Sequence, residues 1–479
     1  MRVGTQHRAW LGLGWTMLAL TTGIHRSWAG DGSDPGPAAP TQSAPTQTHT
    51  GVPTPASVWP MLLGAQYTFI DQAQSPLRSP YQGALSLDSN GDTKTTNTLG
   101  LYGGWAPVGW AQGYLDVEKF DGAGVSHSTG LGGLTNGDVV REGAAGLKKE
   151  FYIARSYLRL MLPLGNQLTS IERAQDQFPG TEAARHLELK IGRMAVPDDF
   201  DQNRYASSAR TEFLNWSLWD NTAFDYAANT RGYTDGVVIG YVGPSWNLKY
   251  GIYYMPIAAN QQTLDSSFRH AHGQNLQLTL SPWSTGTVLR LLYYLNTGRM
   301  GIYDDALAIA AADRTTPDVA ADDRPGRRKY GYGVNLEQPL ADNGDTGMFL
   351  RWGRDDGKTE SFAFTEVDGV LSFGGQLAGT HWHRHDDRFG LGLVDEELSV
   401  PHREYLAAGG SGFLLGDGQL NYGQEQILET YYNFEQIWPR RPGPIRWQVG
   451  PDFQYIQNPG YNRDRGPVHF WAVRIHAEY

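Results

Sequence analysis

The chain has no cysteine, and this absence excludes disulfide-stabilised folds, thiolate metal sites and cysteine catalysis. Long apolar runs are also missing beyond one stretch near the N-terminus, so the 479 residues do not encode a bundle of membrane-spanning helices, each of which needs about 20 apolar residues. Positive charge is in deficit, with 39 Lys and Arg against 50 Asp and Glu. We therefore expect no nucleic acid partner.

Aromatic residues and glycine are abundant instead. Aromatic residues make up 12% of the chain, hydrophobic residues 40%, and there are 59 glycines. This composition is too apolar for a disordered protein and allows either a large core or a large closed surface. Because the apolar residues are rarely contiguous, we expect them to alternate with polar residues along β-strands.

The N-terminus has the pattern of an export signal. Arg2 and Arg8 precede an apolar stretch from Ala9 to Leu20, and small residues follow at Ser27 and Ala29. A single anchoring helix is the alternative, but this stretch is too short to cross a hydrocarbon core of about 30 Å. We therefore predict a signal peptide that is cleaved near Ala29.

The composition changes twice along the rest of the chain. Residues 30–60 are dominated by Gly, Pro, Thr, Ala, Ser and Gln, which predicts a disordered tether. From Met61 onward, aromatic and alternating segments dominate. The predicted organisation is a signal peptide at 1–29, a tether at 30–60 and one folded domain at 61–479.

Two-residue alternation recurs through the predicted domain, and a sustained helical period is not seen. Leu187 to Ile191 and Asn275 to Leu280 each alternate apolar and polar residues. Phe470 to Tyr479 places Trp471 and Val473 on one face and charged residues on the other. Such segments predict strands with one apolar face and one polar face.

Two architectures contain strands of this kind. In a soluble β-sandwich the apolar faces meet in a core, whereas in an outer-membrane barrel the apolar face contacts lipid and the polar face lines a lumen. Both signs of charge on the polar faces favour the barrel, as does Tyr479, which ends the chain in phase with an apolar face. Aromatic residues near expected strand ends also match a membrane-interface girdle. They are Trp105, Trp110, Tyr250, Tyr254, Tyr293 and Tyr294.

We therefore predict an all-β fold, a transmembrane antiparallel β-barrel of about 16 strands, with about 14 to 18 allowed. Three segments lack sustained alternation and are predicted to be loops: Pro163 to Arg185, Ala306 to Lys329 and Ala378 to Asp387. His381, His383 and His385 suggest a metal site, but the absence of a completing ligand favours a polar loop. We expect no metal and no cofactor.

One part of the chain carries three motifs in close succession. They are GRMAVPDDFDQNRYA at 192–206, RTEFLNW at 210–216 and DYAANTRGY at 225–233. These motifs resemble the signature of the carbohydrate-selective outer-membrane porins, the OprB-type family. The family often has His-Asp-Pro where this chain has Ser207-Ser208-Ala209, and Asp where it has Asn229. Two carboxylates of the family pattern are thus absent, and the sugar preference does not follow from the resemblance.

The resemblance implies a barrel in the outer membrane of a Gram-negative cell, surrounded by lipid, with inward-folded loops that form a constriction. It also implies passive diffusion of monosaccharides such as glucose, no enzymatic step, and a monomer or a homotrimer. A sugar-selective constriction needs charged hydrogen-bond donors, carboxylate acceptors and an aromatic plane. The candidates for these roles are Glu118, Arg155, Arg159, Arg193, Asp199, Asp201, Asn203, Arg210, Asn215, Trp216 and Arg231.

Other interpretations remain open at this point. The same arginines and carboxylates can pair with one another and brace the wall and the inward loops. The excess of arginine in the motifs also allows a less selective or anion-preferring porin. An exported β-sandwich that binds carbohydrate, or a glycosidase of that fold, is a third alternative.

Overall fold

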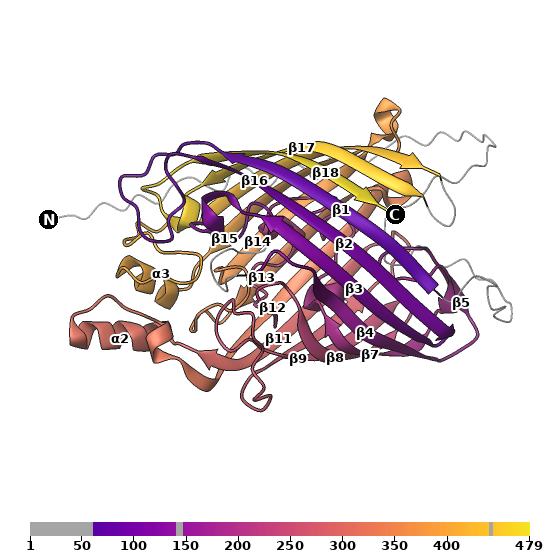
Figure 1. The fold of residues 1–479 in the computed structure, drawn as a ribbon, viewed down its shortest axis with the longest axis horizontal. Coiled ribbons are helices and arrows are strands. Elements are labelled where there is room, and N and C mark those ends of the chain that lie inside the picture. Colours follow the sequence, from indigo (N-terminus) through magenta and orange to yellow (C-terminus); the bar gives the residue numbers. More distant parts are fainter. Residues whose placement is uncertain (1–60, 140–146, 440–443) are drawn as a thin grey trace. The chain divides into compact units, whose positions relative to one another are not determined.

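The computed structural model describes residues 61–139, 147–439 and 444–479. The predicted signal peptide and tether lie outside the described residues. Sixteen of the described strands form one closed antiparallel barrel, in which β1 pairs with β18 (Figure 1). The predicted barrel and its strand number are confirmed, and the β-sandwich alternative is wrong, because the sheet closes on itself and does not form two stacked layers.

The barrel strands follow one another around the wall in sequence order. They are β1 (Met61–Gln74), β2 (Asp92–Val108), β3 (Ala111–Gly122), β4 (Tyr152–Pro163), β7 (His186–Met194), β8 (Thr234–Val242), β9 (Trp246–Tyr254), β10 (His272–Leu280), β11 (Val288–Met300), β12 (Arg324–Ala341), β13 (Thr346–Asp355), β14 (Gly369–Ala378), β15 (Arg388–Glu397), β16 (Glu425–Trp438), β17 (Ile445–Gln457) and β18 (Val468–Glu478).

Smaller elements lie in the connections. A separate two-stranded sheet pairs β5 (Leu168–Ile171) with β6 (Gly180–Ala183). The α-helices are α1 (Trp216–Trp219), α2 (Tyr303–Asp313) and α3 (Val400–Ala407). The 3-10 turns are η1 (Val125–Ser128), η2 (Val196–Asp198), η3 (Ala320–Asp322), η4 (Asp342–Gly344), η5 (Gly379–Trp382) and η6 (Pro459–Tyr461). Within the described residues, no helix is both long enough and apolar enough to cross a membrane.

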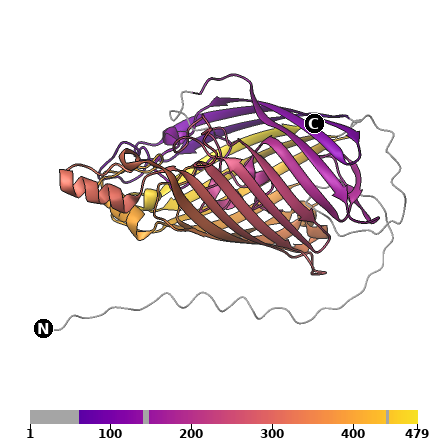
Figure 2. The ribbon, with the colours of Figure 1, turned by 90° about the horizontal axis from the view of Figure 1, so that it is seen from below.

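The two ends of the barrel differ in the length of their connections. At one end, β2 and β3 are joined through residues 109–110 and β8 and β9 through 243–245. At the other end, residues 123–151, 195–233 and 398–424 make long connections, and α2 and α3 lie there, away from the C-terminus (Figures 1 and 2). We call these the turn end and the loop end. In outer-membrane barrels, short turns face the periplasm and long loops face the outside.

Alternation along each strand separates an apolar outer face from a packed interior. On β13, Met348, Leu350 and Trp352 are exposed, whereas Phe349 and Arg351 are buried. The outer face of β12 changes along its length from Tyr330 and Tyr332 to Val334 and Leu336. Aromatic residues beside an aliphatic band are the pattern of a membrane-spanning wall.

The structure corrects two of the predicted loops. Ala306 to Lys329 contains most of α2 and the start of β12. Helix α2 is rich in alanine and has Asp304 and Asp305 in its first turn, which favour a helix. Few of its side chains are buried, so it shows no 3.6-residue apolar period. Pro163 to Arg185 contains the β5–β6 hairpin.

Ala378 to Asp387 is a connection, as expected. Its histidines do not share a strand face, because His381 lies in η5 and His383 adopts a left-handed conformation with φ 62°. No group of three or more ligating side chains that could hold a metal is found in the described parts of the chain.

Side-chain direction also differs from expectation at two places. Tyr294, expected in the interface girdle, points inward and is 1% exposed, whereas its neighbour Tyr293 is 46% exposed. The pairing of β3 with β4 is irregular, because Asp116 pairs with Arg155 and Val117 pairs with Ile153. Ala154 therefore has no partner on β3. This bulge turns both Tyr152 and Arg155 away from the lipid side, where strict alternation would have separated them.

The cost of placing a charge on the outer wall should depend on its depth in the membrane, and this dependence tests whether the wall spans a bilayer. We predict that Leu336→Arg, in the aliphatic band of β12, lowers the free energy of unfolding by about 2–4 kcal/mol, because the guanidinium is placed in hydrocarbon. The matched variant Tyr330→Arg, on the same face nearer the loop end, should cost about 0–1 kcal/mol. Equilibrium urea unfolding in lipid vesicles measures both, and equal costs would contradict the assignment.

Candidate functional site

The connection between β7 and β8, residues 195–233, folds into the barrel; we call it the inward loop. Its Leu214 and Asn215 amides donate to Glu429 of β16 at 2.5 and 2.9 Å. The Asn215 side chain donates to Gln454 of β17 at 3.0 Å. Because β16 and β17 lie on the far side of the strand order from β7, the loop crosses the lumen. The prediction of inward-folded loops is confirmed.

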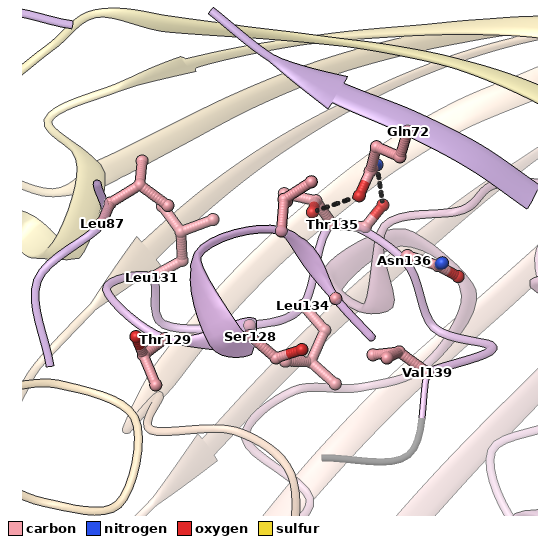
Figure 3. A pocket seen from close by; sticks show the side chains of 12 residues that line it. Gln72, Leu87, Ser128, Thr129, Leu131, Leu134, Thr135, Asn136 and Val139 are labelled. Carbon is pink, nitrogen blue, oxygen red and sulfur yellow. Dashed lines mark hydrogen bonds between the residues drawn. The ribbon is translucent and has the colours of Figure 1, made fainter. Parts of the chain in front are cut away.

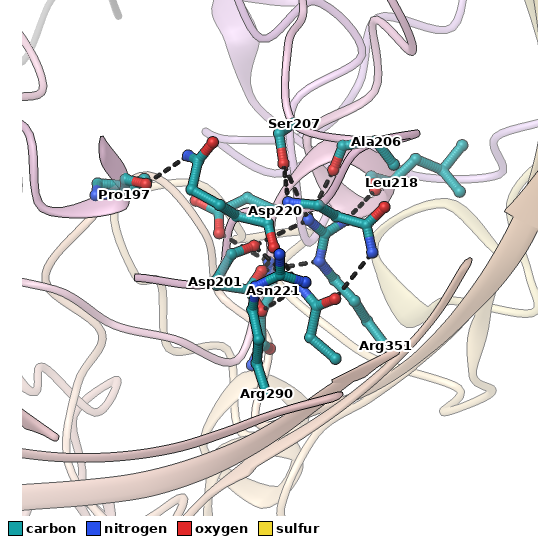
Figure 4. A network of polar contacts seen from close by, with 12 residues as sticks. Pro197, Asp201, Ala206, Ser207, Leu218, Asp220, Asn221, Arg290 and Arg351 are labelled. Carbon is teal, nitrogen blue, oxygen red and sulfur yellow. Dashed lines mark hydrogen bonds and ion pairs between the residues drawn. The ribbon is translucent and has the colours of Figure 1, made fainter. Parts of the chain in front are cut away.

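Arg351 of β13 is the centre of the contacts that hold this loop (Figure 4). Its guanidinium lies 2.7 Å from Asp201 and donates to the carbonyls of Leu218 at 2.7 Å and Ala206 at 2.6 Å. The Arg351 side chain is fully buried. An ion pair closed off from water in this way braces the loop against the wall and offers nothing to a passing solute.

A second connection also enters the lumen. In the β3–β4 connection, Thr135 exchanges hydrogen bonds with Gln72 of β1 at 3.0 Å (Figure 3). Asn136 donates to Thr96 of β2 at 3.1 Å. The cavity beside these residues measures about 10 Å³, which is no more than one water needs. This part of the lumen is therefore filled by protein.

The β5–β6 hairpin enters from the turn end. Glu182 of β6 accepts a hydrogen bond from Arg159 of β4 at 2.6 Å. Gln175, between the two hairpin strands, donates to Asp116 of β3 at 2.6 Å. The lumen is thus narrowed from both ends, and the hairpin lies against the part of the wall formed by β3 and β4.

The interior cations differ in exposure. The side chains of Lys329 and Arg351 are 0% exposed and that of Arg465 is 1% exposed. By contrast, five cations on β4, β7, β9 and the inward loop keep between 14% and 22% of their side chains exposed. These are Arg155, Arg159, Lys190, Arg210 and Lys249. We call these five, with the carboxylates that pair with them, the charged strip.

The arginines of β4 pair with both the wall and the loops. Arg155 makes a two-pronged contact with Asp198 of η2, at 2.7 and 2.8 Å, and lies 3.3 Å from Asp116. Arg159 donates to Glu188 of β7 at 2.6 Å, in addition to its bond with Glu182. Such charge-assisted forks fix the orientation of both guanidinium groups.

Two lysines share one carboxylate in the middle of the strip. Asp199 lies 2.9 Å from the Nζ of Lys190 and 2.6 Å from that of Lys249. Lys249 also lies 3.3 Å from Glu188. The chain of contacts therefore runs without a break from Arg159 through Glu188 and Lys249 to Asp199.

Glu118 of β3 joins the strip to aromatic side chains. It lies 3.2 Å from Arg210 and accepts hydrogen bonds from the hydroxyls of Tyr233 at 2.6 Å and Tyr152 at 3.1 Å. The guanidinium of Arg231 lies 4.0 Å from the centre of the Tyr152 ring. Cations, carboxylates and aromatic rings therefore gather here.

The other candidates lie elsewhere. Asp201, Asn203 and Asn215 are buried in the contacts that hold the inward loop. Trp216 is also buried, with its ring stacked on Phe364 at 4.9 Å, so it presents no open plane. Arg193 donates to the carbonyl of Ile153 at 3.1 Å, at the edge of the strip.

Two loop carboxylates have shifted pKa values. Burial raises the pKa of Glu212 to about 7, and the amides of Ser207 and Ser208, which donate to it, offset part of that rise. Burial opposes ionisation of Asp368 as well, but the neighbouring His402 lowers its pKa to about 2. The pKa values of these two carboxylates are therefore shifted in opposite directions by their surroundings.

Several members of the strip were not among the candidates. Glu188 and Lys190 alternate with apolar residues along β7, and Lys249 does the same along β9, so alternation alone marks them as inward-facing. Asp176 and Glu182 belong to the hairpin that enters from the turn end. No local pattern marks them, because their contacts depend on how the hairpin folds back.

The Arg351–Asp201 pair provides a test of loop bracing. We predict that Arg351→Met lowers the free energy of unfolding by about 3–5 kcal/mol, because Asp201 is left as an uncompensated buried charge. Adding Asp201→Asn removes that charge, so the double variant should cost less than the two single variants together. Urea unfolding in lipid vesicles gives the three values, and strictly additive costs would contradict direct pairing.

Comparison with known proteins places this barrel in a family. Residues 99–479 match the family described as carbohydrate-selective porin, OprB family. No curated protein sequence matches the chain.

Several solved structures are similar to this chain at low sequence identity. The high-pH structure of Pseudomonas putida OprB has a TM-score of 0.62 and 14% identity, covering 88% of this chain and 94% of that one. Its low-pH structure has a TM-score of 0.45 and 12% identity, covering 88% and 92%. An anion-selective porin from Comamonas acidovorans has a TM-score of 0.46 and 10% identity, covering 88% and 99%. The chain therefore belongs to the carbohydrate-selective porin family, OprB, and is a channel of the Gram-negative outer membrane.

Proposed function

We propose that this protein lets monosaccharides such as glucose diffuse passively across the outer membrane, and that they pass along the charged strip. One observation carries the proposal. The five strip cations are partly exposed, whereas other cations in the lumen, such as Arg351, are fully buried. A solute inside the barrel can meet these groups because part of each side chain is in contact with water.

The strip has the chemistry that sugar hydroxyls require. Arg155, Arg159 and Lys249 offer charged donors, and Asp198 and Glu182, whose side chains are 33% and 12% exposed, offer acceptors. Every one of these groups already has a partner, so a sugar gains a hydrogen bond only by competing with an ion pair. Binding is therefore weak, which a channel needs, since a solute that is held tightly does not pass.

The balance of charge in the strip argues against the anion-preferring alternative. Its five cations lie within 4.0 Å of eight carboxylates. These are Asp116, Glu118, Asp138, Asp176, Glu182, Glu188, Asp198 and Asp199. Carboxylates therefore outnumber cations, and the arginine-rich motifs do not create a positive lumen.

We also propose that the channel performs no chemical step and needs no cofactor. Each carboxylate of the strip pairs with a cation, so these contacts explain its position without a catalytic role. The expected assembly, a monomer or a homotrimer, stays a prediction.

Channel recordings test the proposed function. Purified full-length protein reconstituted in planar lipid bilayers should open channels whose ion conductance falls as glucose is added, because a sugar in the strip obstructs ions. Absence of any channel, or a conductance that glucose leaves unchanged, would contradict the proposal. Strong anion selectivity, measured as a reversal potential in a salt gradient, would favour the anion-preferring alternative instead.

The two arginines of β4 give a sharper test of the path. We predict that Arg155→Ala with Arg159→Ala increases the conductance and raises the half-blocking glucose concentration about tenfold or more, because charged hydrogen bonds contribute about 1.5–3 kcal/mol each. A control that makes the same change of charge, Arg269→Ala with Arg314→Ala in exposed loops, should behave like the unmodified protein. If both double variants behave alike, the path does not follow the strip.

A further inference from the structure

A cavity of about 350 Å³ lies at the loop end, on a different part of the barrel from the charged strip. Arg354, Arg403 and Arg463 line it, together with Glu397 and Tyr422. The three arginines come from β13, α3 and the connection between β17 and β18, so the fold brings together segments far apart in the sequence. We call this cavity the arginine pocket.

The arginine pocket belongs to the outer wall. On β13, Arg354 is exposed and follows the outward-facing Trp352, which is 39% exposed, by two residues. Trp352 is paired with Leu371 of β14, which is 42% exposed. Gly369 of β14, two residues nearer the loop end than Leu371, pairs with Arg354 on one side and with Glu397 of β15 on the other. The pocket therefore lies directly beyond the apolar surface that lipid covers.

Positive charge in the pocket exceeds negative charge. Arg354 forms an ion pair with Glu397 at 3.0 Å, and its side chain is still 52% exposed. Arg403 lies with its guanidinium 5.0 Å from the centre of the Tyr422 ring. No ion pair of Arg403 or Arg463 with a carboxylate is found within the described ranges. Three guanidinium groups therefore face one carboxylate.

This arrangement suits a phosphate group. The planar guanidinium matches phosphate oxygens with two parallel hydrogen bonds, and several arginines together accommodate its double charge. A neutral sugar needs no such excess of positive charge, and one moving through the lumen would not reach the outer wall.

We propose that the arginine pocket binds the phosphorylated headgroup of a membrane lipid in the outer leaflet. The loop end faces the outside, so the pocket lies at the height of the outer-leaflet headgroups. A lipid whose chains cover Trp352 and Leu371 has its phosphate next to Arg354. Bound there, it ties α3 and the β17–β18 connection to the barrel wall.

Native mass spectrometry of the full-length protein in detergent tests the proposal, with bisphosphorylated lipid A as the probe. Replacing all three arginines by glutamine (R354Q, R403Q and R463Q) should weaken lipid A binding about tenfold or more, since three charge-assisted contacts are lost. The matched control R269Q, R314Q and R324Q makes the same change of charge on exposed arginines of the loop end and should leave binding unchanged. Equal weakening by both triple variants would overturn the pocket and indicate general attraction by charge.

Two further arms identify the ligand and guard against misfolding. Lipid A without its phosphates should bind about tenfold more weakly to the unmodified protein, and equal binding would overturn recognition of phosphate. Inorganic phosphate at equal concentration should not displace lipid A, and full displacement would indicate a site for free phosphate. If the triple variant does not fold, R403Q with R463Q, which retains the Arg354–Glu397 pair, should still weaken binding severalfold, and unchanged binding would overturn the proposal.

Discussion

Every backbone group that enters the interior of this barrel needs a hydrogen-bond partner, because a packed lumen offers little water. Charged side chains provide many of these partners. Glu429 accepts from the amides of Leu214 and Asn215, and Arg474 of β18 donates to the carbonyls of Ala209 and Glu212 at 2.8 and 2.6 Å. The same wall that encloses the lumen thus holds the loop that narrows it.

Loops hold one another by the same kind of contact. Asp225 of the inward loop accepts from the amides of Phe362 and Ala363 at 3.0 and 2.8 Å, and Glu366 accepts from those of Leu414 and Leu415 at 2.7 Å. A carboxylate satisfies two adjacent amides at once, and a neutral side chain of the same length does so less strongly. This explains why so many carboxylates are buried in a channel for neutral solutes: most of them organise backbone, and only a few have contact with water.

The motifs that mark the family divide in the same way. Asp201, Asn203, Asn215 and Trp216 are buried where the inward loop meets the wall or packs on another loop. Arg210 instead bridges Glu118 of β3 and Asp138 of the second inward connection, with part of its side chain exposed. Most of the motif therefore specifies the path of the loop, and a smaller part specifies what the loop presents to a solute.

Local periodicity predicts the barrel well because the side-chain direction of a strand depends on neighbouring residues alone. The alternation of Trp471 and Val473 with Arg474 is sufficient to assign the faces of β18. It fails where the ladder is irregular, as at Ala154, and where a helix such as α2 is exposed on most sides. The partners of inward-facing charges are harder still to predict from the sequence. Arg155 pairs with Asp198 on a loop that folds back into the barrel, but nothing near Arg155 in the sequence shows that it has this partner and does not face bulk water.

Pairing and exposure together decide which charges can serve a solute. A cation such as Arg351, closed off from water and surrounded by carbonyls, loses several strong contacts if it moves, and no solute can replace them. Arg159 also has partners, Glu182 and Glu188, but 15% of its side chain remains in contact with water. A sugar hydroxyl that takes the place of that water competes with Glu182 and Glu188 for the guanidinium, so its own hydrogen bond is weak. Weak and reversible contact then follows from an interior in which the charges are already satisfied, which is the condition that passive flux requires.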